Sequence, residues 1–114
     1  LPAFNANPAL LQRYSDAANQ QSVFKVQKGP IASGDEDVID RQRASELAEL
    51  TKAQAVAWEG AGGARACRLL NIPFLEIRAI TDTAERRSRK ELESAIHTGM
   101  THIANLLVLA EQQK

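Results

Sequence analysis

Apolar residues recur at helical spacing near both ends of the chain. Asn7 followed by Pro8 is typical of a helix N-cap and first turn, and the helical spacing continues to about Asn19. Near the other end, Ser88 and Glu91 form a capping-box pattern before a long periodic stretch. The apolar positions of that stretch are Leu92, Ile96, Gly99, Ile103, Leu106, Leu107 and Ala110. The pattern therefore predicts an opening helix and a long amphipathic closing helix.

Three segments between these helices have the composition of β-strands. Residues 23–34 are rich in β-branched and apolar side chains, with a bend expected at Gly29 and Pro30. Residues 53–58, AQAVAW, form a short apolar run of the kind that fills a strand covered on both faces. Residues 73–80, PFLEIRAI, alternate apolar and polar side chains, which favours a strand with one less buried face.

Two shorter helices are expected between these strands. Asp40 is a suitable N-cap for the first. Its expected buried positions are Ala44, Leu47 and Ala48. The second, residues 60–70, is rich in glycine and alanine, which lets a helix lie close to a sheet, and Asn71 can end it. With its flanking segments this helix predicts a βαβ unit with parallel strands, so the fold class is α/β.

Composition and charge narrow the possible partners. The 114 residues carry 14 Lys and Arg against 14 Asp and Glu, which gives no electrostatic footprint for nucleic acid or an anionic membrane. The single cysteine, Cys67, cannot form an internal disulfide, which fits a reducing compartment. The opening LPAFNANPAL has no initiator Met and no signal-peptide pattern, so we expect a trimmed beginning. The cytoplasm and small-molecule or protein partners are the expectation.

Polar residues follow the predicted strands where each one ends. Glu59 comes directly after residues 53–58, and Asp82 follows residues 73–80. Parallel strands end at the same edge of a sheet, and open α/β sheets bind ligands at that carboxyl edge. Ser33 would join them if the earlier strand runs in the same direction. Each acid alone has a simpler explanation as a first-turn or capping residue. The coincidence of three polar strand ends favours a site.

Other candidate motifs have simpler structural explanations. The stretch GAGGAR begins like a dinucleotide fingerprint, but Arg65 occupies the last glycine position. His97 and His102 are five residues apart, which does not place them on one helix face as metal ligands. Cys67 is expected to be a packed thiol, and ERRSRK at 85–90 a solvated segment that could also lie over an anionic ligand. We expect no metal and no cofactor.

Three motifs in order carry a family resemblance. GPIASGD, AVAWEGAGGARAC and IPFLEIRAITDTA resemble the C-terminal half of the purine nucleoside phosphorylase and nucleosidase superfamily. The likeness is greatest to 5'-methylthioadenosine/S-adenosylhomocysteine nucleosidases, with GLIxSGD, AVxMEAAAIAxxC and VPFxxxRAISDxA. It implies part of a three-layer αβα fold with a central mixed, largely parallel sheet. Residues 1–114 would then be the C-terminal portion of one domain whose N-terminal half is absent, and inactive alone.

The resemblance also implies a reaction and roles for particular residues. It implies cleavage of the N-glycosidic bond of a purine-type nucleoside. Glu59 would accept hydrogen bonds from the ribose 2' and 3' hydroxyls, and Asp82 would donate a proton to purine N7. That role requires a raised pKa for the Asp82 carboxyl. Thr81 would place a hydroxyl beside this acid, and the backbone of Val38 would contact the base. Family members commonly form dimers or larger homo-oligomers.

Two residues depart from the family pattern. Trp58 stands where the family has a Met that packs on the sugar, so it would form a larger and flatter wall of the substrate pocket. Asp37 stands where an aromatic residue stacks on the base, which weakens the case for adenine. A hydrolase is the leading hypothesis. The alternatives are a phosphorylase that uses phosphate and a non-catalytic nucleoside-binding descendant.

Overall fold

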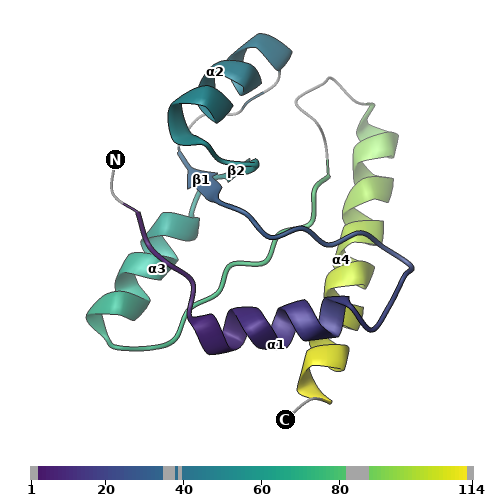
Figure 1. The fold of residues 1–114 in the computed structure, drawn as a ribbon. Helices are drawn as coiled ribbons and strands as arrows, with labels where there is room; N and C mark the ends of the chain where they lie inside the picture. The colour runs from purple at the N-terminus through teal and green to yellow at the C-terminus, as the bar shows by residue number, and fades with distance from the viewer. Residues whose placement is uncertain (1–2, 35–37, 39, 82–87, 113–114) are drawn as a thin grey trace.

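The computed structural model describes residues 3–34, 38, 40–81 and 88–112. These residues form a mixture of helices with a small parallel sheet, which is an α/β arrangement (Figure 1). The elements are α1 (Pro8–Ala18), β1 (Ile31–Ser33), α2 (Arg41–Thr51), β2 (Ala55–Ala57), α3 (Gly60–Leu69) and α4 (Arg89–Glu111). The helices expected from the sequence are all present.

The helices begin at the capping residues that the sequence indicated. The side-chain oxygen of Asn7 accepts a hydrogen bond from the Leu10 N–H at 2.9 Å, and Asp40 caps α2 in the same way at 2.8 Å. Ser88 caps α4 through the Glu91 N–H at 3.1 Å. Helix α3 ends before Asn71, which adopts a left-handed φ of 56°. Local side-chain hydrogen bonds therefore define the starts of α1, α2 and α4.

The strands are much shorter than the sequence predicted. β1 and β2 pair in parallel as the single sheet of the described residues, with Ser33 opposite Ala57. The predictions for the rest of 23–34 and 53–58 are wrong, as is the whole strand predicted at 73–80. A strand is stable only where a neighbour pairs with its backbone groups. In the part of the chain that the structure describes, residues 23–30 and 73–80 have no such ladder.

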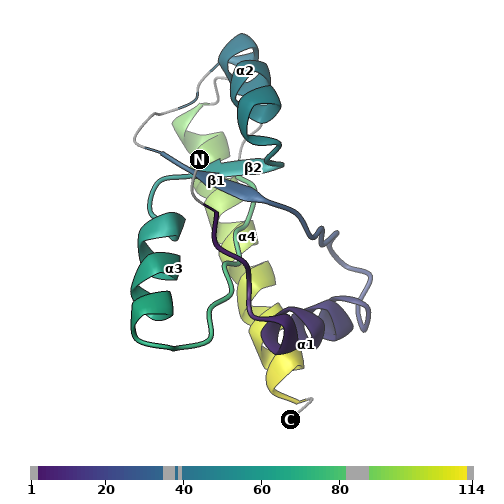
Figure 2. The ribbon, with the colours of Figure 1, turned by 60° about the vertical axis from the view of Figure 1, so that its left-hand side comes forward.

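The βαβ unit expected from residues 53–80 is therefore not formed, and the two parallel strands are β1 and β2 instead. Helix α2 joins the two parallel strands, while α3 leads into the extended segment 73–80 (Figure 2). The described residues contain neither a central mixed sheet nor three layers.

The main packing contact is between α1 and α4. Ala17 of α1 is buried against Leu106 and Ala110 of α4. Half-buried side chains surround this centre, namely Tyr14, Ala18, Phe24, Ile77 and Leu109. Further along α4, the buried Gly99 lets the helix backbone lie close to Ala79, whose Cβ would overlap a side chain there. Small residues at these crossings allow the close packing.

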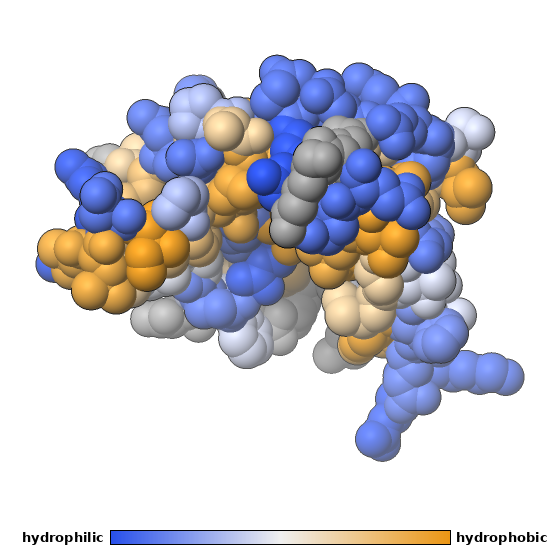
Figure 3. All heavy atoms as spheres, turned by 90° about the horizontal axis from the view of Figure 1, so that it is seen from below, coloured by the Kyte–Doolittle hydropathy of each residue, from blue (hydrophilic) through white to orange (hydrophobic). Residues whose placement is uncertain are grey.

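Part of the apolar surface is left uncovered by the described residues. Ile96 on the predicted stripe of α4 is 45% exposed, and in α2 Ala44 and Leu47 are only half-buried while Ala48 is exposed. The burial predicted for α2 is therefore wrong, because little of the described chain packs against that helix. Figure 3 shows hydrophobic residues among hydrophilic ones on the face seen from below. No described helix is long and apolar enough to cross a membrane.

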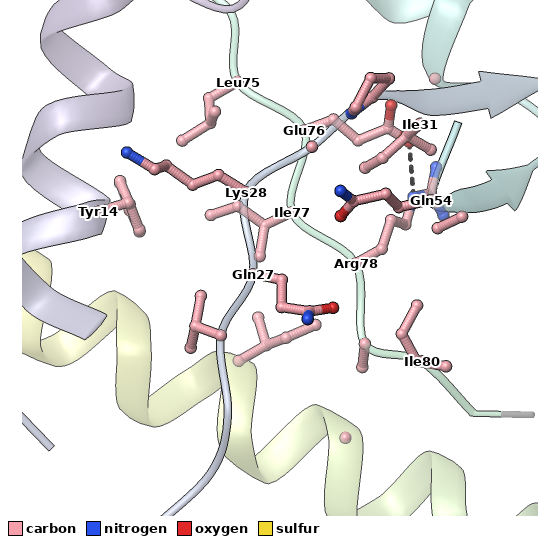
Figure 4. A pocket seen from close by; sticks show the side chains of 18 of the residues that line it. Tyr14, Gln27, Lys28, Ile31, Gln54, Leu75, Glu76, Ile77, Arg78 and Ile80 are labelled. Carbon is pink, nitrogen blue, oxygen red and sulfur yellow. Dashed lines mark hydrogen bonds and ion pairs between the residues drawn. The ribbon is translucent and has the colours of Figure 1, made fainter. Parts of the chain in front are cut away.

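An open hollow of about 2220 Å³ lies between these elements. Residues of α1, α4, the segment 23–33 and the segment 74–81 line it. Figure 4 shows how the segment 74–80 divides its side chains: Leu75 and Ile77 point toward α1, whereas Glu76 and Arg78 point toward the strands. The alternation predicted for this segment is thus present without the strand.

Candidate active site

The carboxyl ends of β1 and β2 lie together at one edge of the sheet. The strands are parallel and Ser33 is the register partner of Ala57, so both strands end at the same edge of the sheet. Glu59 follows two residues after Ala57, directly before α3. The condition set for Ser33 is met, because β1 runs in the same direction as β2 and Ser33 lies at the same edge as Glu59.

Ser33 caps the helix that follows Glu59. Its hydroxyl oxygen accepts a hydrogen bond from the Ala61 N–H at 2.9 Å, across 28 residues of sequence. Glu59 occupies the N-cap position of α3 but makes no side-chain capping hydrogen bond. The Ser33 hydroxyl satisfies one of the N–H groups that a helix start leaves without an intrahelical partner. The Glu59 carboxylate is therefore available for other contacts.

The Glu59 carboxylate forms an ion pair with Arg78. Oε1 of Glu59 contacts Nη2 of the Arg78 guanidinium, and Nε of the same guanidinium donates to Oε2 of Glu76 at 2.8 Å. The side chain of Glu59 is 65% exposed, whereas that of Glu76 is only 16% exposed. Arg78 therefore joins a largely buried carboxylate to one that faces the solvent.

The two carboxylates raise the pKa of Arg78 above its ordinary value. The hydrogen bond to Glu76 has the largest effect, the one to Glu59 follows, and partial burial opposes both. A raised folded-state pKa stabilises the fold below the unfolded-state pKa, and the contribution is lost only as pH rises through the folded value. For an arginine that range is strongly alkaline. Arg78 therefore stays cationic at any pH near neutrality.

Sequence reasoning missed both Glu76 and Arg78 as site residues. The signal that could have revealed them was the alternation in residues 73–80. Residues two apart on an extended segment share a face, so Glu76 and Arg78 lie side by side and opposite Leu75 and Ile77 (Figure 4).

The other predicted site residues have different surroundings. Thr81 is half-buried and lines the hollow, as do Ser33 and Arg78. Trp58 is 60% exposed beside Glu59, and Val38 is half-buried. Asp82, the predicted acid, and Asp37, at the predicted base-stacking position, lie outside the described residues.

The histidines and the cysteine have structural surroundings. The ring of His102 stacks on Phe24 with centroids 4.4 Å apart, while His97 is exposed. Cys67 is a half-buried free thiol on α3. Among the described residues, no group of three His, Cys, Asp or Glu side chains could hold a metal ion.

Comparison with known proteins identifies the family. The sequence pattern of the phosphorylase superfamily matches residues 1–110, so the chain belongs to that superfamily. Among curated relatives, the chain is 29% identical to a 5'-methylthioadenosine/S-adenosylhomocysteine nucleosidase of Bacillus cytotoxicus over 108 residues. It is 30% identical to the protein of the same name from Bacillus cereus strain B4264. The family suggested by the three motifs is thus confirmed.

The alignments cover a larger share of this chain than of its relatives. Each alignment covers 94% of this chain but 47% of the relative. The chain therefore spans about half the length of the curated relatives it matches. No solved structure gives a significant match.

Proposed function

We propose that the natural protein containing these residues hydrolyses the N-glycosidic bond of a purine-type nucleoside, as a 5'-methylthioadenosine/S-adenosylhomocysteine nucleosidase-like enzyme. Membership of the phosphorylase superfamily and the names of the relatives support this class of reaction. The observation that carries the proposal is the placement of Glu59. Its carboxylate is tethered by Arg78 at the edge where the two parallel strands end.

Glu59 is assigned the ribose hydroxyls in this proposal. One of its oxygens contacts Arg78, and the side chain is mostly exposed, so the other oxygen can accept hydrogen bonds from a sugar. Trp58, next to it in the chain and also exposed, would form a wall beside the sugar. Ser33 lies at the same edge, where its hydroxyl accepts from Ala61 and can still donate its own proton.

Asp82 is assigned the proton transfer. Cleavage of an N-glycosidic bond gives an oxocarbenium-like sugar and an electron-rich departing base. Protonation of the base at N7 makes it a better leaving group, and a carboxylic acid can supply that proton. Thr81, the residue before Asp82 in the sequence, lines the hollow. The Val38 backbone would contact the base. Water completes the reaction in a hydrolase, and phosphate would do so in a phosphorylase.

Nucleoside cleavage with and without phosphate tests the proposed function. The natural protein, expressed at its full natural length, should release purine base from a ribonucleoside panel in phosphate-free buffer. Base release that requires phosphate would show a phosphorylase instead. Ligand binding without base release under either condition would show the non-catalytic nucleoside-binding alternative, which Trp58 and Asp37 motivate.

The described residues are proposed to form the C-terminal portion of a larger domain of three αβα layers around a mixed, largely parallel sheet. The support is the open hollow, the extended segments 23–30 and 73–80, which pair with no strand among the described residues, and the twofold greater length of the relatives. In the natural protein, backbone amides of both segments should then be protected from hydrogen exchange. Exchange as fast as in an unfolded chain would contradict the proposal.

The family resemblance also supports a proposal about assembly and location. We expect a homodimer or a larger homo-oligomer, and a protein that works in the cytoplasm on a free nucleoside. The uncovered apolar side chains, which include Trp58 and Ile96, support an assembly because contacts between copies would bury them. Sedimentation of the natural protein as a monomer would argue against it.

A further inference from the structure

We propose that Glu76 is a positioning residue: by holding Nε of Arg78, it limits Arg78 to one oxygen of Glu59 and keeps the other oxygen free for substrate hydroxyls. The inference rests on the proposed role of Glu59 in ribose binding. It adds a residue that the family resemblance does not assign and that makes no contact with the sugar itself.

The geometry of the guanidinium carries this inference. The edge formed by Nε and Nη2 can bind one carboxylate with two parallel hydrogen bonds. Here that edge is divided, because Nε donates to Glu76 at 2.8 Å while Nη2 contacts Glu59. Without Glu76 the whole edge would be open to Glu59. Both Glu59 oxygens would then be engaged, and the carboxylate would accept hydrogen bonds from a sugar less well.

The position of the Glu76 carboxylate depends on Gly60. Gly60 is the first residue of α3 and is buried, and a Cβ built on it would overlap both oxygens of Glu76. The missing side chain therefore makes the space in which this carboxylate lies. The start of a helix also favours negative charge, because its N–H groups and macrodipole point toward it. Glu76 is thus the mostly buried partner of Arg78, and Glu59 is the exposed one.

The kinetics of two Glu76 variants test the proposal in the natural full-length protein. Glu76→Leu removes the acceptor, whereas Glu76→Gln keeps its volume and a weaker acceptor. For a ribonucleoside, Glu76→Leu should raise KM about tenfold with kcat nearly unchanged, and Glu76→Gln about threefold, because one charge-assisted contact is redirected. The KM of the 2'-deoxy analogue should rise less, since this analogue makes fewer hydrogen bonds to Glu59.

The matched control is Glu46→Gln. Glu46 pairs with Arg43 at 3.2 Å on the exposed surface of α2, and its loss should change neither KM nor the preference for ribose. If Glu76 had a purely structural role, its loss would weaken the binding of both substrates equally. An unchanged ratio of ribonucleoside to 2'-deoxynucleoside efficiency in both Glu76 variants would therefore overturn the proposal. If the Leu variant does not fold, the Gln variant gives the same comparison.

A spectroscopic measurement separates this proposal from the proposed function. When Glu76 is present, the substitution Glu59→Gln should leave the NMR signal of the Arg78 Nε–H unchanged, because this N–H donates its hydrogen bond to Glu76. In the Glu76→Leu variant, the same substitution should shift this signal, since the Nε–H of Arg78 would then donate to Glu59. Equal responses in the two backgrounds would refute the positioning role. Absence of base release from every nucleoside would refute the function alone.

Discussion

Replacing Asp82 with Asn should remove most of the base-release activity while nucleoside binding is retained. An amide can donate a hydrogen bond to purine N7 but cannot transfer a proton to it. Loss of a general acid typically costs about 100-fold to 10,000-fold in rate. The expected result is a fall of that size in kcat with a dissociation constant near the wild-type value, measured by calorimetry on the full-length natural protein.

A substrate with a better leaving group provides the control for Asp82. When a nitrophenyl riboside is cleaved, the nitrophenolate leaves as a stable anion and needs no proton, so the Asp82→Asn variant should cleave this substrate nearly as fast as wild type. Equal losses on the nucleoside and the nitrophenyl riboside would show that Asp82 acts on something other than the base. Unchanged binding and turnover of the nucleoside would remove Asp82 from the site altogether.

The helices could be predicted because their signals are local. Asn7, Asp40 and Ser88 each accept a hydrogen bond from a residue three positions further on, so a few neighbouring letters define each start. A strand has no such local definition. Residues 73–80 have the right alternation, yet among the described residues no strand pairs with them. Strand formation depends on the whole sheet, and the sequence of one segment cannot report it.

The candidate site was predictable to a similar degree. The common edge of Ser33 and Glu59 follows from strand direction, which the sequence left conditional and the parallel pairing decides. The Ser33 contact with Ala61 and the division of Arg78 between two acids depend on how separate segments approach one another. Side-chain contacts of that kind have no sequence spacing of their own. They became visible only when the segments after β2 and α3 were placed in space.

Glu59→Gln should reduce kcat/KM for a ribonucleoside about 100-fold, because two hydrogen bonds from hydroxyls to a carboxylate each contribute about 1.5 to 3 kcal/mol, part of which the amide retains. The preference for ribose over 2'-deoxyribose should shrink with it. Stability should fall by less than about 1 kcal/mol, since the Glu59 side chain of this ion pair is 65% exposed. Kinetics on both sugars together with urea denaturation measure these quantities.

The two measurements together decide what Glu59 does. Arg78 keeps its contact with Glu76 when Glu59 becomes neutral, so the cluster retains a charged partner and the fold should survive. A large loss of activity with intact stability and a reduced ribose preference is the signature of a sugar-binding carboxylate. If activity falls only in proportion to the folded fraction, Glu59 serves the structure through Arg78. The ribose hydroxyls would then need another acceptor.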